Sequence, residues 1–322
     1  TWLDTGIRNL LLISNGTVSL EQGHFDLHFA QGSRFELGTL NSASLELVEV
    51  NALVQQALDL RIEEDGSVEL SSGGVDLYLP NIIFQGKSSH VVSAISDLSG
   101  RLSTTETRLQ AHAQLRNIGS DWLPFIFRKP ELELDITSDS AMLSANGLLN
   151  IADRELVQFE FEMDTSTFLG QAQFETPIIN FGNGSLSLAN LFFRAPFEAD
   201  IVSGSLQSSA ELKINRAENG SWLLNGPLQV NVNEISGFYQ DTAMINFSTN
   251  LSGTLQDSLN FVSEGLRPLS LANIDLGLPV EAITLQYGID TLGTRLSIEN
   301  IEARLFGGRV HSTGFIYDWN AP

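Results

Sequence analysis

The chain has 322 residues, 42% of them hydrophobic, and it contains no cysteine, which excludes disulfides and thiolate metal sites. Its 17 basic and 39 acidic residues give a net charge of −22, spread over the whole length. A surface of this charge repels phosphate backbones, so a nucleic-acid partner is excluded as a leading hypothesis.

Segments in which polar and apolar residues alternate follow one another along the whole chain. A strand with this period has one apolar face and one polar face. Turn signals of the Asn-Gly or Asp-Gly type separate many of them, at Asn15, Asp65, Asn146, Asn183, Asn219 and Asn225. In chain order, the clearest alternating segments are 24–29, 45–50, 75–79, 131–136, 158–163, 185–188, 210–215, 226–235, 244–251 and 295–305.

Helical patterns are scarce. Residues 51–60 predict a short helix with Asn51 as its cap, and residues 120–127 predict a helical turn before Pro130. Neither segment is long enough to cover a sheet of on the order of 20 to 25 strands. The sequence therefore predicts an all-β fold built from a long, twisted and mostly antiparallel sheet.

The apolar faces of so many strands need a partner. They pack against a second sheet in a β-sandwich, or they line a trough that apolar molecules can fill. Periodicity alone does not separate these alternatives. We expect residues 1–322 to be one continuous segment excised from a longer protein, with a possible sub-boundary near residues 116–130.

Groups with catalytic or metal-binding chemistry are hard to find. His24, Asp26 and His28 share one strand face, but ligands spaced in this way spread over roughly 13 Å and do not meet at one ion without a bend. We therefore interpret them as a solvated polar face and expect no metal. The sequence contains no nucleophile elbow and no P-loop, so we expect no enzyme and no cofactor.

The C-terminal third resembles a known family. The stretch from Leu276 to Trp319 is similar to the AsmA-like proteins of Gram-negative bacteria, and especially to their YdbH branch, in which a strand pair ends in a Leu-Phe-Gly-Gly-Arg/Lys step. Here that step runs from Leu305 to Arg309. The stretch from Asn225 to Leu255 resembles the family's strand, turn and strand unit, with the turn expected at Ser236, Gly237 and Phe238.

The resemblance implies a bridge-like lipid-transfer function. Such proteins cross the periplasm as a sheet folded into a trough with an apolar lining, and they move phospholipid between the inner and outer membranes. The family implies an inner-membrane anchor, here outside the segment, and a small outer-membrane lipoprotein that adds strands near the C-terminal end. The alternative that the residues leave open is a structural or adhesive β-sandwich or β-solenoid that binds a protein or glycan.

We predict that the lining is formed by the one-sided alternating sets. These residues are Phe25, Leu27, Phe29, Leu132, Leu134, Ile136, Phe159, Phe161, Leu212, Ile214, Leu228, Val230, Val232, Leu285, Tyr287, Leu296 and Ile298.

Overall fold

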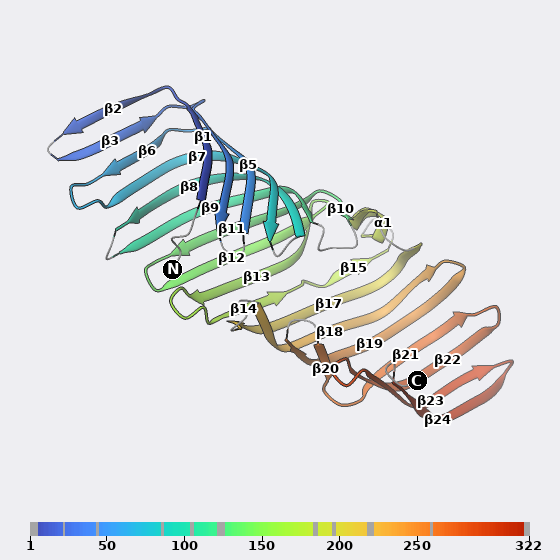
Figure 1. Cartoon of the computed structure of the whole chain (residues 1–322). Coiled ribbons are helices and arrows are strands. Elements are labelled where there is room, and N and C mark those ends of the chain that lie inside the picture. The colour runs from blue at the N-terminus through green and yellow to red at the C-terminus, as the bar shows by residue number, and fades with distance from the viewer. Residues whose placement is uncertain are drawn as a thin grey trace. The chain divides into compact units, whose positions relative to one another are not determined.

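The computed structural model describes residues 6–318, except residues 22, 43–44, 85–86, 104–105, 121–125, 183–185, 195–197, 218–221 and 258–259. In this part of the chain, 22 strands belong to one large antiparallel sheet (Figure 1). Outside that sheet lie the helix α1 (Leu188–Leu191) and the short strands β10 (Ile126–Phe127) and β16 (Phe192–Arg194). The all-β fold expected from the alternation is therefore confirmed. None of the described helical residues belong to a helix long and apolar enough to span a bilayer.

The chain divides into two compact units, which are described separately. The N-terminal unit comprises Thr1–Arg154 and Asp164–Ser166, and the C-terminal unit comprises Glu155–Met163 and Thr167–Pro322. The expected sub-boundary near residues 116–130 lies partly outside the described residues. It stays a prediction, as does the expectation of one continuous segment from a longer protein.

The N-terminal unit is an antiparallel meander. Its order is β1, β4, β5, β7, β8, β9, β11 and β12, and a second branch of β2, β3 and β6 also joins β7. The strands are β1 (Gly6–Ile13), β2 (Gly16–Glu21), β3 (His24–Phe29), β4 (Arg34–Ser42), β5 (Leu45–Val54), β6 (Leu58–Ile62), β7 (Val68–Phe84), β8 (Lys87–Leu102), β9 (Thr107–Ser120), β11 (Pro130–Ser138) and β12 (Met142–Ile151).

Strand β7 belongs to both branches. Its first residues, 68–72, pair with β6, and residues 75–84 pair with β5. Strands β1 and β2, β3 and β4, and β5 and β6 are therefore three long strands, each broken by a corner at residues 14–15, 30–33 and 55–57. Figure 1 shows β1 and β5 turned steeply against β2, β3 and β6. We call these branches the β1 half-sheet (β1, β4, β5) and the β2 half-sheet (β2, β3, β6).

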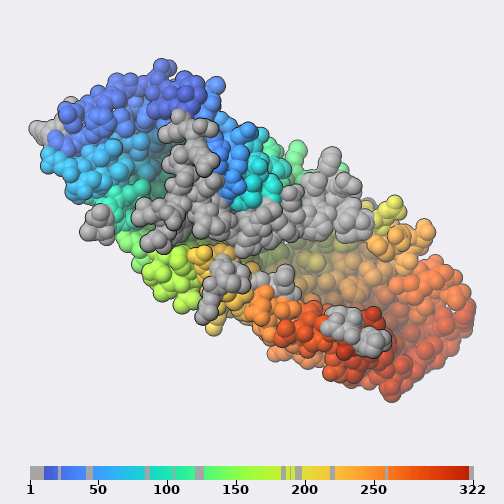
Figure 2. All heavy atoms as spheres, in the orientation of Figure 1, coloured from blue at the N-terminus to red at the C-terminus, as the bar shows by residue number. Residues whose placement is uncertain are grey.

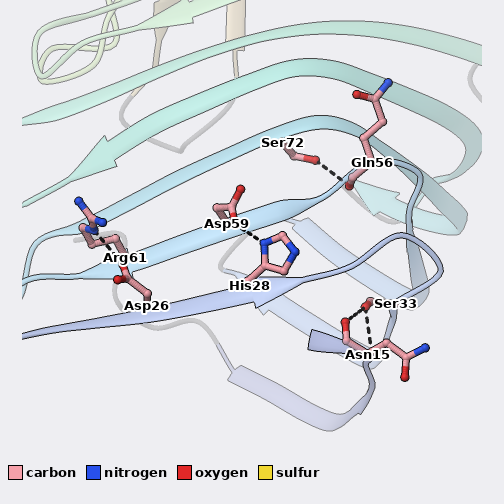
Figure 3. Close-up of polar contacts among 8 residues, drawn as sticks. All are labelled: Asn15, Asp26, His28, Ser33, Gln56, Asp59, Arg61 and Ser72. Atoms are coloured by element: carbon pink, nitrogen blue, oxygen red, sulfur yellow. Dashed lines mark hydrogen bonds and ion pairs between the residues drawn. The ribbon is translucent and has the colours of Figure 1, made fainter. Parts of the chain in front are cut away.

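Hydrogen bonds hold the corner between the half-sheets (Figure 3). The amide of Asn15 donates to Ser33 Oγ at 3.3 Å, and the amide of Val54 donates to the carbonyl of Ser33 at 2.9 Å. The hydroxyl of Ser72 donates to the carbonyl of Gln56 at 3.5 Å. Val54 and Ser33 are 0% and 1% exposed, so these polar groups need partners inside the protein. The corner therefore contains two of the most deeply buried residues of this unit.

The C-terminal unit is a second meander, coloured from green-yellow to red in Figure 1. β13, β14, β17, β18, β19, β21, β22, β23 and β24 pair in this order, while β15 also pairs with β17 and β20 pairs with β19 and β22. The strands are β13 (Arg154–Asp164), β14 (Gly170–Glu175), β15 (Ile179–Phe181), β17 (Ala199–Arg216), β18 (Trp222–Tyr239), β19 (Thr242–Gln256), β20 (Asn260–Ser263), β21 (Arg267–Asp275), β22 (Pro279–Asp290), β23 (Arg295–Leu305) and β24 (Gly308–Asp318).

Several long strands contain one residue in the left-handed region of backbone conformation. In β23 this residue is Asn300, with φ of 53°, between Ile298 and Ile301. The pairings of β17 with β18, β18 with β19 and β22 with β23 shift register near such residues. An extra residue of this kind shifts the alternation by one, so that apolar residues on both sides of it stay on the same face. The others inside strands include Asp97, Gly204, Glu234, Asn246, Ala282 and Gly314.

The predicted helix at residues 51–60 is wrong. This segment forms the end of β5, a corner and the start of β6. Both strands form backbone ladders with β7, and this tertiary pairing outweighs the local helical preference of Ala, Leu and Gln. Of the other predicted segment, residues 121–125 lie outside the described residues, and residues 126–127 form β10.

Only some of the predicted turns are confirmed. Asp65-Gly66 connects β6 to β7, and the step from Leu305 to Arg309 forms the hairpin turn between β23 and β24. The turn expected at Ser236–Phe238 is wrong, because these residues belong to β18. Asn146-Gly147 and Asn225-Gly226 also lie inside strands, Asn15-Gly16 lies at a corner between unpaired strands, and the pairs at 183–184 and 219–220 lie outside the described residues.

Candidate functional site

One face of the N-terminal unit carries a continuous apolar row. Directly opposed residues of paired strands lie on the same face of a sheet. Ala113 in β9 and Val91 in β8 share this face and are 4% and 8% exposed. From β4 to β12 the row consists of Phe35, Ala52, Leu77, Ser93, Leu115, Leu132 and Leu149, with the buried Ser93 as its one polar member.

The β2 half-sheet continues this apolar face. Its row runs through Leu27, Leu60 and Leu70, which are directly opposed on β3, β6 and β7. At the corner, the rings of Phe29 and Phe35 meet edge to face, with centroids 5.2 Å apart. The apolar faces of the two half-sheets therefore join at the corner and lie on the same side of the bent sheet.

The C-terminal unit has a face of the same kind. Phe159 and Phe174 lie opposite each other and stack with ring centroids 6.1 Å apart. Next to them, Phe161 belongs to a row with Ala172 and Leu212. Figure 2 shows the surface of this unit hollowed over the yellow-to-orange strands β17 to β19. This face offers hydrocarbon contact over many strands with few hydrogen-bonding groups.

The opposite face of the N-terminal unit is charged. Arg61 Nε donates to Asp26 Oδ1 at 2.8 Å, and Arg101 pairs with Glu69 at 3.3 Å, so charges of opposite sign alternate across β3, β6, β7 and β8 (Figure 3). The hydrogen bond from Arg61 holds the pKa of the Asp26 carboxyl below its usual range. This ladder keeps the outer face solvated and fixes which face is polar.

The histidines of β3 belong to this polar face. His24 lies 3.2 Å from Asp26, while His28 Nδ1 lies 2.6 Å from Asp59 on β6. The strand therefore directs its two imidazoles to different carboxylates. No group of three potential metal ligands occurs among the described residues.

A comparison with protein-family models gives the family of this protein. The model described as YdbH-like, intermembrane phospholipid transport protein YdbH, matches residues 2–320. The chain belongs to the YdbH-like family. The match extends the similarity from the C-terminal third to nearly the whole chain. Searches of curated proteins and of solved structures found no significant match.

Membership of the YdbH-like family identifies phospholipid as the cargo and transport between membranes as the process. The family is one of lipid transport proteins and not of enzymes. It also indicates a location between two membranes, in the periplasm.

The structure shows where the predicted lining residues of this YdbH-like chain lie. Cross-strand pairing places them on the apolar face of their unit. Phe29, Leu212 and Tyr287 are buried, Phe25 is exposed, and the other thirteen are half-buried. Tyr287 hydrogen-bonds to Thr249 at 2.9 Å, so its hydroxyl has a protein partner. Their assignment to a lipid groove stays a prediction.

Sequence reasoning missed part of the apolar face in the YdbH-like chain. Val75, Val91, Ala111 and Ala113 lie on it and are at most 8% exposed. Alternation was present, since Ala111 and Ala113 flank His112, but small residues give a weaker signal than Leu or Phe.

Proposed function

We propose that the apolar faces of both units line a groove that holds phospholipid acyl chains, and that the protein is a periplasmic conduit for transport between the inner and outer membranes. The observation that carries this proposal is the half-burial of the one-sided apolar residues. Core positions of a sandwich are mostly fully buried. Here side chains such as Phe161 and Val230 are neither buried by a second sheet nor fully exposed.

Hydrocarbon suits such a face because it needs no directional contacts. Each methylene removed from water contributes about 0.8 kcal/mol, so two acyl chains bind strongly to an apolar lining. Sliding along the lining exchanges one apolar environment for another and costs little. The headgroup stays in solvent at the open side. We further propose an inner-membrane anchor and a small outer-membrane lipoprotein that adds strands at β24, the last strand of the sheet.

The test compares two neighbouring residues of β18 that point to opposite faces. Val230 lies on the apolar face and Gln229 on the polar face. We expect Val230→Asp to block lipid passage and to lower the amount of phospholipid that copurifies without detergent, measured by native mass spectrometry. Phe161→Asp should act in the same way. Gln229→Asp should leave both unchanged, because its side chain is already solvated.

The proposal is wrong if folded Val230→Asp carries and transfers as much phospholipid as the unsubstituted protein. It is also wrong if the unsubstituted protein, purified without detergent, is free of lipid and does not take lipid up from vesicles. The second outcome would favour a scaffold that binds a protein or glycan.

A further inference from the structure

The turn between β23 and β24 is built in an unfavourable way. Its two central residues, Phe306 and Gly307, have φ of 50° and 77°, the combination of a type I′ turn. Asn-Gly suits this turn best, because a bulky side chain in the left-handed region is strained. Phe306 is nevertheless there, and its side chain is 77% exposed. An aromatic residue that strains the turn and contacts little protein points to a role outside the fold.

Other apolar side chains lie beside this turn. Val280 and Leu305 are directly opposed on β22 and β23, so the β21–β22 turn adjoins the β23–β24 turn. That neighbouring turn exposes Leu276 and Leu278 to 66% and 50%. Together these side chains form an apolar tip of the C-terminal unit, consisting of Leu276, Leu278 and Phe306.

Two arginines stand directly behind the apolar tip. Arg304 and Arg309 are directly opposed across β23 and β24. Like charges in this position destabilise a strand pair. Glu281 is the other cross-strand neighbour of Arg304, but no carboxylate of the described residues lies within 4.0 Å of either guanidinium. Two of the 17 basic residues of the chain therefore lie side by side without an ion-pair partner in the part of the chain that the structure describes.

We propose that this hairpin docks the protein on a phospholipid bilayer, with the apolar tip inserted at the interface and with Arg304 and Arg309 bound to lipid phosphates. The spacing fits, because each arginine is two residues from the turn and therefore about 7 Å behind it. Interfacial segments insert by about 5–10 Å, which brings groups at that height to the phosphates. Arginine binds phosphate through two parallel hydrogen bonds. Acidic residues more than about 8–10 Å from the two arginines act weakly on them, because salt screens charges beyond that distance.

A bilayer fits this surface better than a protein does. The apolar side chains stand on separate turns instead of forming a flat patch, and the order from tip to base is apolar and then cationic. The inference relies on the family's function of phospholipid transport between membranes, but it does not depend on the proposed groove. Binding to vesicles and lipid content are therefore measured separately.

The experiment is vesicle flotation of the whole chain with phosphatidylethanolamine and phosphatidylglycerol vesicles. Phe306→Asn keeps a favourable type I′ turn, so we expect an unchanged or raised melting temperature and about tenfold weaker vesicle binding. The double variant Arg304→Gln, Arg309→Gln should bind weakly and lose most of the salt dependence. All variants should keep their copurified phospholipid.

Matched controls lie at the other ends of the same strands. Leu292 is 58% exposed in the β22–β23 turn, and Arg295 begins β23. Leu292→Asn and Arg295→Gln should bind vesicles like the unsubstituted protein. The proposal is overturned if Phe306→Asn binds vesicles normally, if the controls lose as much binding, or if the unsubstituted protein binds soluble glycerophosphate but not vesicles.

Discussion

Asp26 and Arg61 illustrate how single residues fix the two faces of the sheet. Their hydrogen bond crosses from β3 to β6, while Leu27 and Leu60, the next residues along, face the other side. An ion pair at the surface contributes little by itself. Repeated across neighbouring strands, however, such pairs favour one register over a slip that would expose the apolar row.

The lowered pKa of Asp26 predicts a specific pH dependence. The pKa of Asp26 is lower in the folded state than its unfolded value of about 3.9. The ionised Asp26 carboxylate therefore stabilises the folded protein above the unfolded-state pKa, and this stabilisation is lost as pH falls through the folded-state pKa. Asp26→Asn should therefore lower the urea midpoint near pH 7 and have a smaller effect at about pH 3. Asp241→Asn, in an exposed turn, is the control. Equal effects of Asp26→Asn at both pH values would contradict the prediction.

At the scale of elements, most strands could be predicted but their ends and partners could not. The strand predicted at residues 185–188 is wrong, because Ser187 caps helix α1 and Leu188 begins it. Alternation has a strong local signal, which is why the segment 158–163 became β13 as expected. Asn146-Gly147 and Asn225-Gly226 fulfil the local rule for a turn, yet both are taken up into ladders of long strands. Gly237 shows a different use of glycine, since an added Cβ would lie 2.2 Å from the carbonyl oxygen of Asp200. That glycine permits close strand approach and marks no turn.

The candidate site was predictable to a similar extent. A period of two assigns residues such as Val230 and Phe161 to one face, and strand pairing shows which residues share that face, while its role as a lipid lining stays a prediction. The joining of the half-sheets at Phe29 and Phe35 was not predictable, because it depends on corners between segments that do not pair with each other. Local patterns contain no information on such long-range geometry.

Non-glycine residues in the left-handed conformation inside strands should reduce stability. Ala282 has φ of 49° and is exposed in β22. The left-handed conformation costs alanine about 1–2 kcal/mol, while glycine loses about 0.5–1 kcal/mol more conformational entropy on folding. Ala282→Gly should therefore stabilise the protein by about 0.5–1 kcal/mol, measured by urea unfolding. Ala303 in β23 is the control, since glycine inside an ordinary strand costs about 0.5–1 kcal/mol. If both substitutions destabilise equally, the left-handed conformation of Ala282 has no energetic cost.

At the scale of the whole molecule, most described strands belong to one sheet, and many apolar side chains on its apolar face are only half-buried. If hydrocarbon occupies that face, as we propose, the protein is expected to be least stable when the face is empty and most stable when it is filled. The net charge of −22 supports solubility in the empty state, because molecules of like charge repel one another.

Lipid loading should therefore raise thermal stability. A ligand at about 100 times its dissociation constant stabilises the native state by about 2.7 kcal/mol, which corresponds to several degrees in melting temperature. Scanning calorimetry of delipidated and reloaded protein measures this difference. Val230→Asp should abolish the gain while Gln229→Asp keeps it. Equal melting temperatures of empty and loaded protein would contradict the prediction.

The uninterrupted passage of β7 from one half-sheet to the other has a mechanical consequence. Two domains joined by a flexible linker move freely relative to each other. Here, any change in the angle between the β1 half-sheet and the β2 half-sheet must bend β7 and the backbone hydrogen bonds along it. We expect this part of the protein to deform elastically, so that the angle between the half-sheets widens slightly when wider cargo binds and returns to its original value when the cargo leaves.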